Sequence, residues 1–358
     1  MFNWRGHLRL ALGAILLLGC LGAVGAESSS WSHMNLLARS SDVLVKVQLN
    51  EADWQWLRGK RTLVLGVTAP DYAPFDIMAS GTDLEGVTAD YMGVLAEALN
   101  VRVEVRRYAD RQSAISALQK GEIDLLSRAT HYESSFPGVS LSLPYFTNQP
   151  VIVGPQGMRL DSGDQLRGKR LSVVSDYFSN EELARDFPGA TIMPFLSLHQ
   201  ALEAVAFGQA DLFVGDTFSA QYLMSQGYLA NLKPLNFASF NGAGFSFAVR
   251  SSDEPLLKIL DRALAATPQQ LDNAIQRRWS PGGAYSIASQ RLILTPQEQR
   301  WMERNPHPVL VVDRAQAPIS FFDSQRNFQG IAADLLDLIH ARTGLSFDVR
   351  PEPSVSTM

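Results

Sequence analysis

An internal repeat with a period of about 244 residues constrains this chain more than any other feature of its sequence. The segment from Pro74 to Arg106 matches the segment from Pro318 to Arg350 without a gap. Solenoid repeats have periods of only about 20 to 50 residues, so this spacing predicts tandem whole domains. The identical pairs include Pro74/Pro318, Gly86/Gly330, Ala89/Ala333, Asp90/Asp334, Val105/Val349 and Arg106/Arg350.

Each copy is preceded by a similar segment, which extends the repeat upstream. The run from Leu49 to Leu57 resembles the run from Leu294 to Met302, and both carry a tryptophan at the eighth position. The second run contains Thr-Pro-Gln-Glu directly after Leu294, which is typical of a helix N-terminus with a capping box, with Thr295 as the cap. We therefore expect a lead-in segment with a helix at 27–60, a linker helix at 286–305 and the start of a second domain at 306–358.

Strand and helix patterns alternate within the first unit. Residues 101–106 alternate with the strand period, 113–120 carry apolar residues at helical spacing, and 121–126 read as a turn followed by a strand. The same order returns between residues 171 and 216. This alternation predicts a mostly parallel α/β sheet in each of two lobes, with a ligand cleft at the carboxyl ends of the strands.

The N-terminus predicts export. Arg5 and Arg9 precede an apolar run that ends in Val24-Gly25-Ala26, so residues 1–26 have the pattern of a cleaved signal peptide. A lipid-modified Cys20 after Leu-Leu-Gly is the alternative, although the bulky Leu18 is atypical of that motif. Either way, we expect a periplasmic location.

Composition and motifs exclude several functions. Lys and Arg total 31 against 36 Asp and Glu, without a basic run, so a nucleic-acid partner is not expected. The single cysteine and six scattered histidines offer no metal-ligand spacing, and no catalytic motif is present. We expect no metal, no cofactor and no catalytic residue in this chain.

A series of short motifs carries a resemblance to a known family. They are Tyr72-Ala-Pro-Phe75, Gly86 to Asp90, Gly121-Glu-Ile-Asp124, Ser142-Leu-Pro-Tyr145, Leu166-Arg-Gly-Lys169, Gly208 to Asp216, Gly244 to Arg250 and Ala274 to Trp279. Their order resembles that of bacterial extracellular solute-binding proteins, family 3, of the polar-amino-acid type. The resemblance implies a periplasmic-binding-protein type II (Venus flytrap) clamshell at 61–285. Lobe 1 would comprise 61–146 plus 244–285 and lobe 2 would comprise 147–243, with hinge crossovers near 145–153 and 244–249.

Two such units in tandem resemble the periplasmic sensor region of BvgS/EvgS-like hybrid sensor histidine kinases. The resemblance implies that a small solute, or lobe closure itself, controls signal transduction in a longer, membrane-anchored parent. That parent would be homodimeric and would reach a response regulator only through its kinase part. The alternative is the substrate-binding protein of an ABC transporter for polar amino acids or related small molecules.

The motifs also imply which residues contact a ligand. Tyr72 and Phe75 follow the first strand, and a core role is equally open for Phe75. Asp216 stands where amino-acid binders hold an α-amino group, whereas Asp90 and Asp334 are expected to cap helices and Asp124 and Asp211 to be structural. The candidate ligand-binding residues are Tyr72, Phe75, Arg111, Arg128, Thr130, His131, Ser175, Asp176, Tyr177 and Asp216.

One departure from the family pattern puts an amino-acid ligand in doubt. Amino-acid binders carry an arginine before the Phe-Ser-x-Pro-Tyr phrase, where it clamps the α-carboxylate of the ligand. Ser135 or its neighbour stands there in this chain, and Asp176 would repel a carboxylate in lobe 2. Arg111 or Arg128 could substitute, and the first unit could equally bind no small molecule. These alternatives stay open at the level of sequence.

Overall fold

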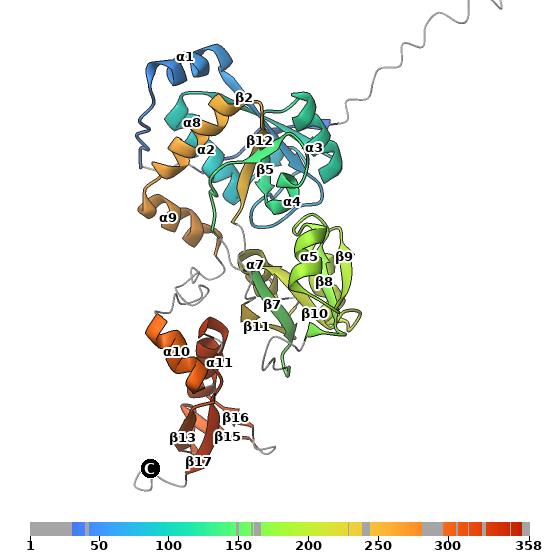
Figure 1. Cartoon of the computed structure of the whole chain (residues 1–358), viewed down its shortest axis with the longest axis vertical. Helices are drawn as coiled ribbons and strands as arrows, with labels where there is room; N and C mark the ends of the chain where they lie inside the picture. Colours follow the sequence, from blue (N-terminus) through green and yellow to red (C-terminus); the bar gives the residue numbers. More distant parts are fainter. Residues whose placement is uncertain are drawn as a thin grey trace, which may run out of the picture.

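The structure is a computed structural model, and its described residues fall into two α/β lobes and a smaller C-terminal unit (Figure 1). The described residues are 31–39, 43–147, 150–158, 160, 166–227, 229–237, 244–280, 296–305, 307–313, 315–323, 327–343 and 345–352. The predicted signal peptide, Cys20 and the predicted cap Thr295 lie outside them. None of the described helices is long and apolar enough to cross a membrane.

Lobe 1 is built on a seven-stranded mixed sheet, in the order β3-β1-β4-β2-β5-β12-β6. Its central strands β4, β2 and β5 are parallel, and β12 joins them antiparallel after the chain has returned from lobe 2. The strands are β1 (Trp31–Leu36), β2 (Thr62–Thr68), β3 (Asp83–Leu84), β4 (Arg102–Tyr108), β5 (Leu125–Ala129), β6 (Val139–Leu141) and β12 (Ser246–Arg250). The helices are α1 (Glu51–Lys60), α2 (Val87–Leu99), α3 (Arg111–Lys120), α4 (His131–Ser134), α8 (Glu254–Ala265) and α9 (Gln269–Trp279).

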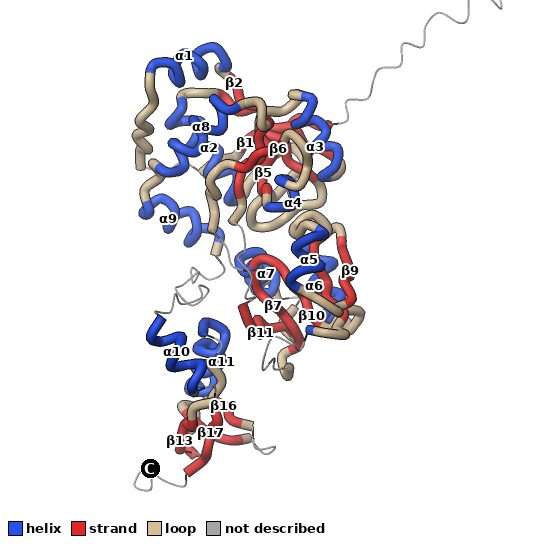
Figure 2. Tube along the Cα trace, in the orientation of Figure 1, coloured by secondary structure: helices blue, strands red, loops and turns tan. Residues whose placement is uncertain are grey.

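Helices cover both faces of the lobe 1 sheet, which explains why all five residues of β5 are buried. Leu125 packs in the core that includes α2 and α8, whereas its neighbour Leu126 packs in a separate core with Ile115 and Leu118 of α3. Successive residues of β5 therefore supply two different cores. Figure 2 shows the strands of the lobe enclosed by these helices.

Lobe 2 repeats the plan with a five-stranded sheet, in the order β11-β7-β10-β8-β9. Strands β10, β8 and β9 are parallel. At one side of the sheet β7 pairs antiparallel with β10, and β11 pairs antiparallel with β7. The elements are β7 (Pro150–Pro155), β8 (Arg170–Val174), α5 (Asn180–Asp186), β9 (Thr191–Phe195), α6 (Leu198–Ala206), β10 (Leu212–Asp216), α7 (Thr217–Ser225) and β11 (Leu232–Phe237). The expected α/β clamshell is thus confirmed.

The C-terminal unit reproduces the first part of lobe 1. Helix α11 (Ile331–Thr343) occupies the residues equivalent to α2, and β13 (Val309–Asp313) pairs parallel with β17 (Asp348–Glu352) as β2 pairs with β4. Gly330 and Gly86 both have positive φ, and a Cβ at either would collide with backbone carbonyls of the preceding loop. The remaining elements are α10 (Pro296–Arg304), β14 (Ala315–Gln316), β15 (Ser320–Phe322) and β16 (Phe328–Gln329).

The two copies differ in burial at equivalent positions. Val87 is fully buried in the core of lobe 1, whereas its equivalent Ile331 is 61% exposed. The described residues of the C-terminal unit include no counterpart of α8 and α9, which pack on α2, and several of its apolar side chains are exposed. The exposed and buried pairs are Ile319/Phe75, Ile331/Val87 and Leu335/Tyr91.

The predicted capping role of Asp90 is wrong. The residue that caps α2 is Gly86, whose positive φ turns the chain into the helix. The Asp90 carboxylate is fully buried one turn later and accepts hydrogen bonds from the Arg39 amide, Arg278 and the Trp279 indole. It therefore attaches α9 and the N-terminal segment to α2. The prediction that Asp124 and Asp211 are structural agrees with their bonds to Lys60 and Arg170.

Candidate functional site

The chain crosses between the lobes at two adjacent points. Phe146 and Phe245 form an antiparallel bridge there, with backbone hydrogen bonds in both directions at 3.3 and 2.8 Å. Gly244 allows this approach, because a Cβ on it would collide with the carbonyl oxygen of Phe146. The hinge thus brings the strand ends of both sheets to the same cleft.

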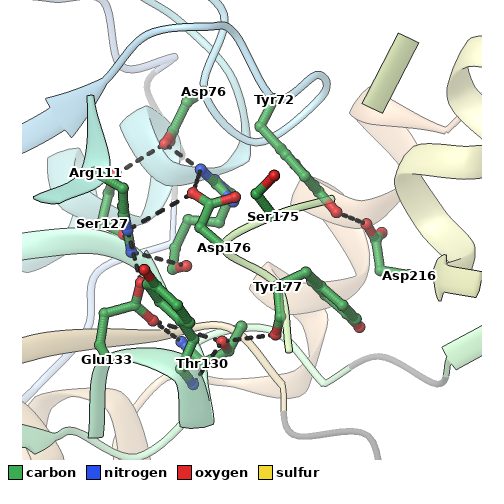
Figure 3. A network of polar contacts seen from close by, with 12 residues as sticks. Tyr72, Asp76, Arg111, Ser127, Thr130, Glu133, Ser175, Asp176, Tyr177 and Asp216 are labelled. Carbon is green, nitrogen blue, oxygen red and sulfur yellow. Dashed lines mark hydrogen bonds and ion pairs between the residues drawn. The ribbon is translucent and has the colours of Figure 1, made fainter. Parts of the chain in front are cut away.

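Tyr72 of lobe 1 reaches across the cleft to Asp216 of lobe 2. Its hydroxyl donates a hydrogen bond of 2.6 Å to Oδ2 of Asp216, and both side chains are almost completely buried (Figure 3). Asp216 ends β10 and caps α7, where its other oxygen accepts from the Ser219 amide at 2.7 Å. Burial, followed by the neighbouring Asp216 carboxylate, raises the pKa of Tyr72 well above its usual value. The hydroxyl therefore stays a donor.

A guanidinium of lobe 1 also meets a carboxylate of lobe 2. Arg128 Nη2 lies 3.2 Å from Asp176 Oδ2, and Arg128 Nε lies 3.7 Å from Asp76 Oδ2 of its own lobe. Arg128 stacks over the Tyr72 ring at 4.1 Å and has φ of 52°, which is uncommon for a residue with a side chain. The strained backbone aims the cation into the cleft, where it pairs with Asp176.

Arg111, in the first turn of α3, holds the loop that carries these groups. It donates to Glu133 Oε1 at 2.6 Å and to the carbonyl oxygens of Ser127 and Arg128 at 2.8 and 3.2 Å. Glu133 in turn accepts from the Thr130 amide and forms a capping box at α4. Thr130 Oγ1 then donates a hydrogen bond of 3.0 Å across the cleft to the carbonyl oxygen of Tyr177. One network thus links α3, α4 and lobe 2.

The charges in this network explain the pKa shifts of Asp176 and Arg128. Burial opposes the charged form of Asp176, but Arg128 and then Arg111 outweigh it and lower the pKa of this carboxyl. Burial likewise opposes the Arg128 cation, while Asp176 and Asp76 raise its pKa above the usual range. Both partners are therefore ionised at neutral pH. Four buried atoms of the network, Asp76 Oδ1, Arg111 Nη1, Arg128 Nε and Arg128 Nη1, have no hydrogen-bond partner among the described residues.

The ten residues that the sequence predicts to contact a ligand lie in different environments. Phe75 is fully buried against Phe146, Phe218 and Phe245, so its side chain belongs to the aromatic core beneath the hinge. Ser175 is exposed and bonds to the Phe195 carbonyl, and His131 is exposed at the start of α4. The other seven residues contribute side-chain or backbone groups to the network in the cleft. Their contacts with a ligand stay predictions.

Sequence reasoning missed three members of the network, Asp76, Ser127 and Glu133. Glu133 stands three residues after Thr130, and this capping-box spacing could have placed its carboxylate beside the Thr130 amide. Asp76 follows the aromatic loop without any local signal. Its Oδ2 accepts from Ser127 at 2.9 Å, which is a contact across 51 residues of sequence.

Residues 64–282 match the family model of bacterial extracellular solute-binding proteins, family 3. The chain belongs to this family. The match extends from β2 to just beyond α9, so it includes both lobes and the hinge between them. The α/β Venus flytrap fold inferred for the family is the fold described above.

The similarity to individual proteins continues past the clamshell. The virulence sensor protein BvgS of Bordetella pertussis is 37% identical over 333 residues, which are 93% of this chain and 27% of BvgS. The sensor protein EvgS of Escherichia coli O157:H7 is 26% identical over 90% of this chain and 27% of its own length. This family-3 chain thus spans about a quarter of the sensors that it matches.

A solved structure shows a similarity that extends over the same part of the chain. The crystal structure of the B. pertussis BvgS periplasmic domain superposes with a TM-score of 0.75 at 37% identity, over 91% of this chain and 63% of that one. The superposition covers more of the chain than the family-3 clamshell alone. The resemblance to sensor regions therefore includes residues beyond the first clamshell.

Proposed function

We propose that this chain is the periplasmic sensing region of a sensor histidine kinase, and that its first clamshell relays lobe closure. The observation that carries the proposal is that the two lobes are bonded directly to each other in the cleft, through Tyr72 to Asp216, Arg128 to Asp176 and Thr130 to Tyr177. These bonds engage the Asp176 carboxylate and the Tyr72 hydroxyl, two groups that the sequence predicts to contact a solute.

The energetics favour closure without a bound solute. A hydrogen bond that involves a charged group contributes about 1.5–3 kcal/mol when buried, and two of the three bonds are of this kind. Together they bias the lobes toward the closed form by on the order of a few kcal/mol. A signal that shifts the lobes must interact differently with the open and closed forms. A small solute that binds Arg128 or Asp216 in place of their partners across the cleft would interact more favourably with the open form and would therefore favour opening of the lobes.

The proposed sensor function also implies partners. The parent protein is proposed to be anchored in the inner membrane as a homodimer, with histidine kinase activity and a response regulator as the recipient of the signal. The similarity to BvgS and EvgS supports this proposal because it extends over the clamshell, α10 and the start of the second unit. A transport receptor with a single clamshell is less supported, since such a protein has no need of the second unit.

A chimaera tests the proposal. Residues 31–352 would replace the matching segment of B. pertussis BvgS, and a reporter promoter controlled by that sensor would be measured. We expect the Tyr72→Phe/Asp176→Asn double variant, which removes two cross-lobe bonds, to change reporter output at least threefold at equal protein level. The matched control is Tyr222→Phe in α7. Equal output from the unmodified and double-variant chimaeras would contradict the proposal.

A further inference from the structure

A second opening between the lobes lies beside the cleft network, between α4 of lobe 1 and α5 of lobe 2. It is a groove of about 590 Å³, which is within the range of roughly 300–1,000 Å³ typical of small-molecule sites. The two short helices face each other across the lobe boundary in Figure 1. The residues that line the groove are His131, Ser134, Ser135, Ser179, Glu181, Glu182, Arg185 and Asp186.

The hydroxyl protons in the groove are already used within their own helices. Ser134 donates to the His131 carbonyl oxygen at 3.0 Å, and Ser135 donates to the Tyr132 carbonyl oxygen at 2.6 Å. Ser179, the cap of α5, donates to Glu182 Oε2 at 3.0 Å. All three hydroxyls therefore present lone pairs, and not protons, to a molecule in the groove.

The charged groups leave an excess of acceptors on the lobe 2 wall. Arg185 is paired with Asp186 through two bonds of 2.8 Å, so these two charges offset each other. Glu182 uses one oxygen in its capping box, whereas the exposed Glu181 carboxylate accepts no hydrogen bond from the described residues. Two carboxylate charges thus face a wall of serine lone pairs and the exposed His131 ring.

We propose that this groove binds an organic cation with several ammonium N–H donors, held by both lobes. A lining that offers acceptors and net negative charge selects a donor-rich cation and disfavours anions. The volume suits a flexible di- or triamine more than a bare metal ion, and the described residues contain no group of three or more metal-ligating side chains. The site is separate from the central cleft, and its occupancy does not depend on the proposed signalling role.

Calorimetric titration of spermidine into the purified chain tests the site, at about 50 and 300 mM NaCl. We expect saturable binding with one molecule per chain. Loss of one charge-assisted contact in Glu181→Gln weakens binding about tenfold. Ser135→Phe, which fills the groove without changing any charge, abolishes saturable binding while leaving the thermal unfolding midpoint within a few degrees of the unmodified chain.

The matched control is Glu254→Gln, because Glu254 is also an exposed acid in the first turn of a helix, on α8 and away from the groove. Its affinity for spermidine should stay within twofold of the unmodified chain. The proposal is overturned by the absence of saturable binding, or by equal effects of Glu181→Gln and Glu254→Gln, which would mean attraction to the overall negative charge only. Because binding is measured on the isolated chain, a silent chimaera leaves this result unaffected.

Discussion

The hydroxyl of Tyr72 lies 2.6 Å from the carboxylate of Asp216, although the two residues are 144 positions apart and belong to different lobes. The loop after β2 and the end of β10 meet only because the hinge at Phe146 and Phe245 brings the carboxyl ends of both sheets together. The carboxylate expected to hold the amino group of a ligand is thus bonded to the chain itself.

Removal of this bond should destabilise the closed form. Tyr72→Phe removes this buried hydrogen bond to Asp216, and we expect the free energy of unfolding to fall by about 1–3 kcal/mol. Urea unfolding at pH 7 measures the change, and small-angle X-ray scattering should report a larger radius of gyration as the lobes separate. Tyr222→Phe on α7 is the control. Unchanged stability and an unchanged radius would refute the role given to Tyr72.

Acid should weaken the cleft through Asp176. Arg128 and Arg111 lower the pKa of this carboxyl in the folded state, so its contribution to stability is present above the unfolded pKa of about 3.9 and is lost as pH falls through the lower folded value. We expect stability to decline below about pH 4, and to decline less steeply in Asp176→Asn. Thermal unfolding from pH 2.5 to 7 gives the two slopes. Parallel slopes would show that Asp176 is not linked to folding.

Equivalent positions of the two copies should respond differently to the same change. Val87→Ala removes buried methyl groups from the core of lobe 1 and should cost about 1–2 kcal/mol, whereas Ile331→Ala at a largely exposed site should cost less than about 0.5 kcal/mol. Chemical unfolding of both variants measures this contrast. Hydrogen exchange should also be faster in α11 than in α2. Equal costs at the two positions would mean that Ile331 is buried in solution.

Local patterns were sufficient for much of the fold. The Gly86 and Gly330 repeat predicted the correspondence of α2 and α11, since both glycines take the positive φ that starts the helix. The Thr130-x-x-Glu133 spacing encodes its capping box. Asp90 was misassigned as a cap because its position in the first turn is compatible with capping, while its actual partners, Arg278 and Trp279, are about 190 positions away.

The sequence by itself determined that the chain contains one α/β clamshell and the start of another, because strand alternation, helix periodicity and the repeat are properties of neighbouring residues and of matching segments. Only the tertiary structure decided what the cleft side chains do. Arg128, Asp176 and Asp216 are compatible with a bound solute in sequence, yet in the fold Arg128 contacts Asp176 and Asp216 contacts Tyr72. Which charge meets which depends on how the hinge sets one lobe against the other, and no local pattern encodes that distance.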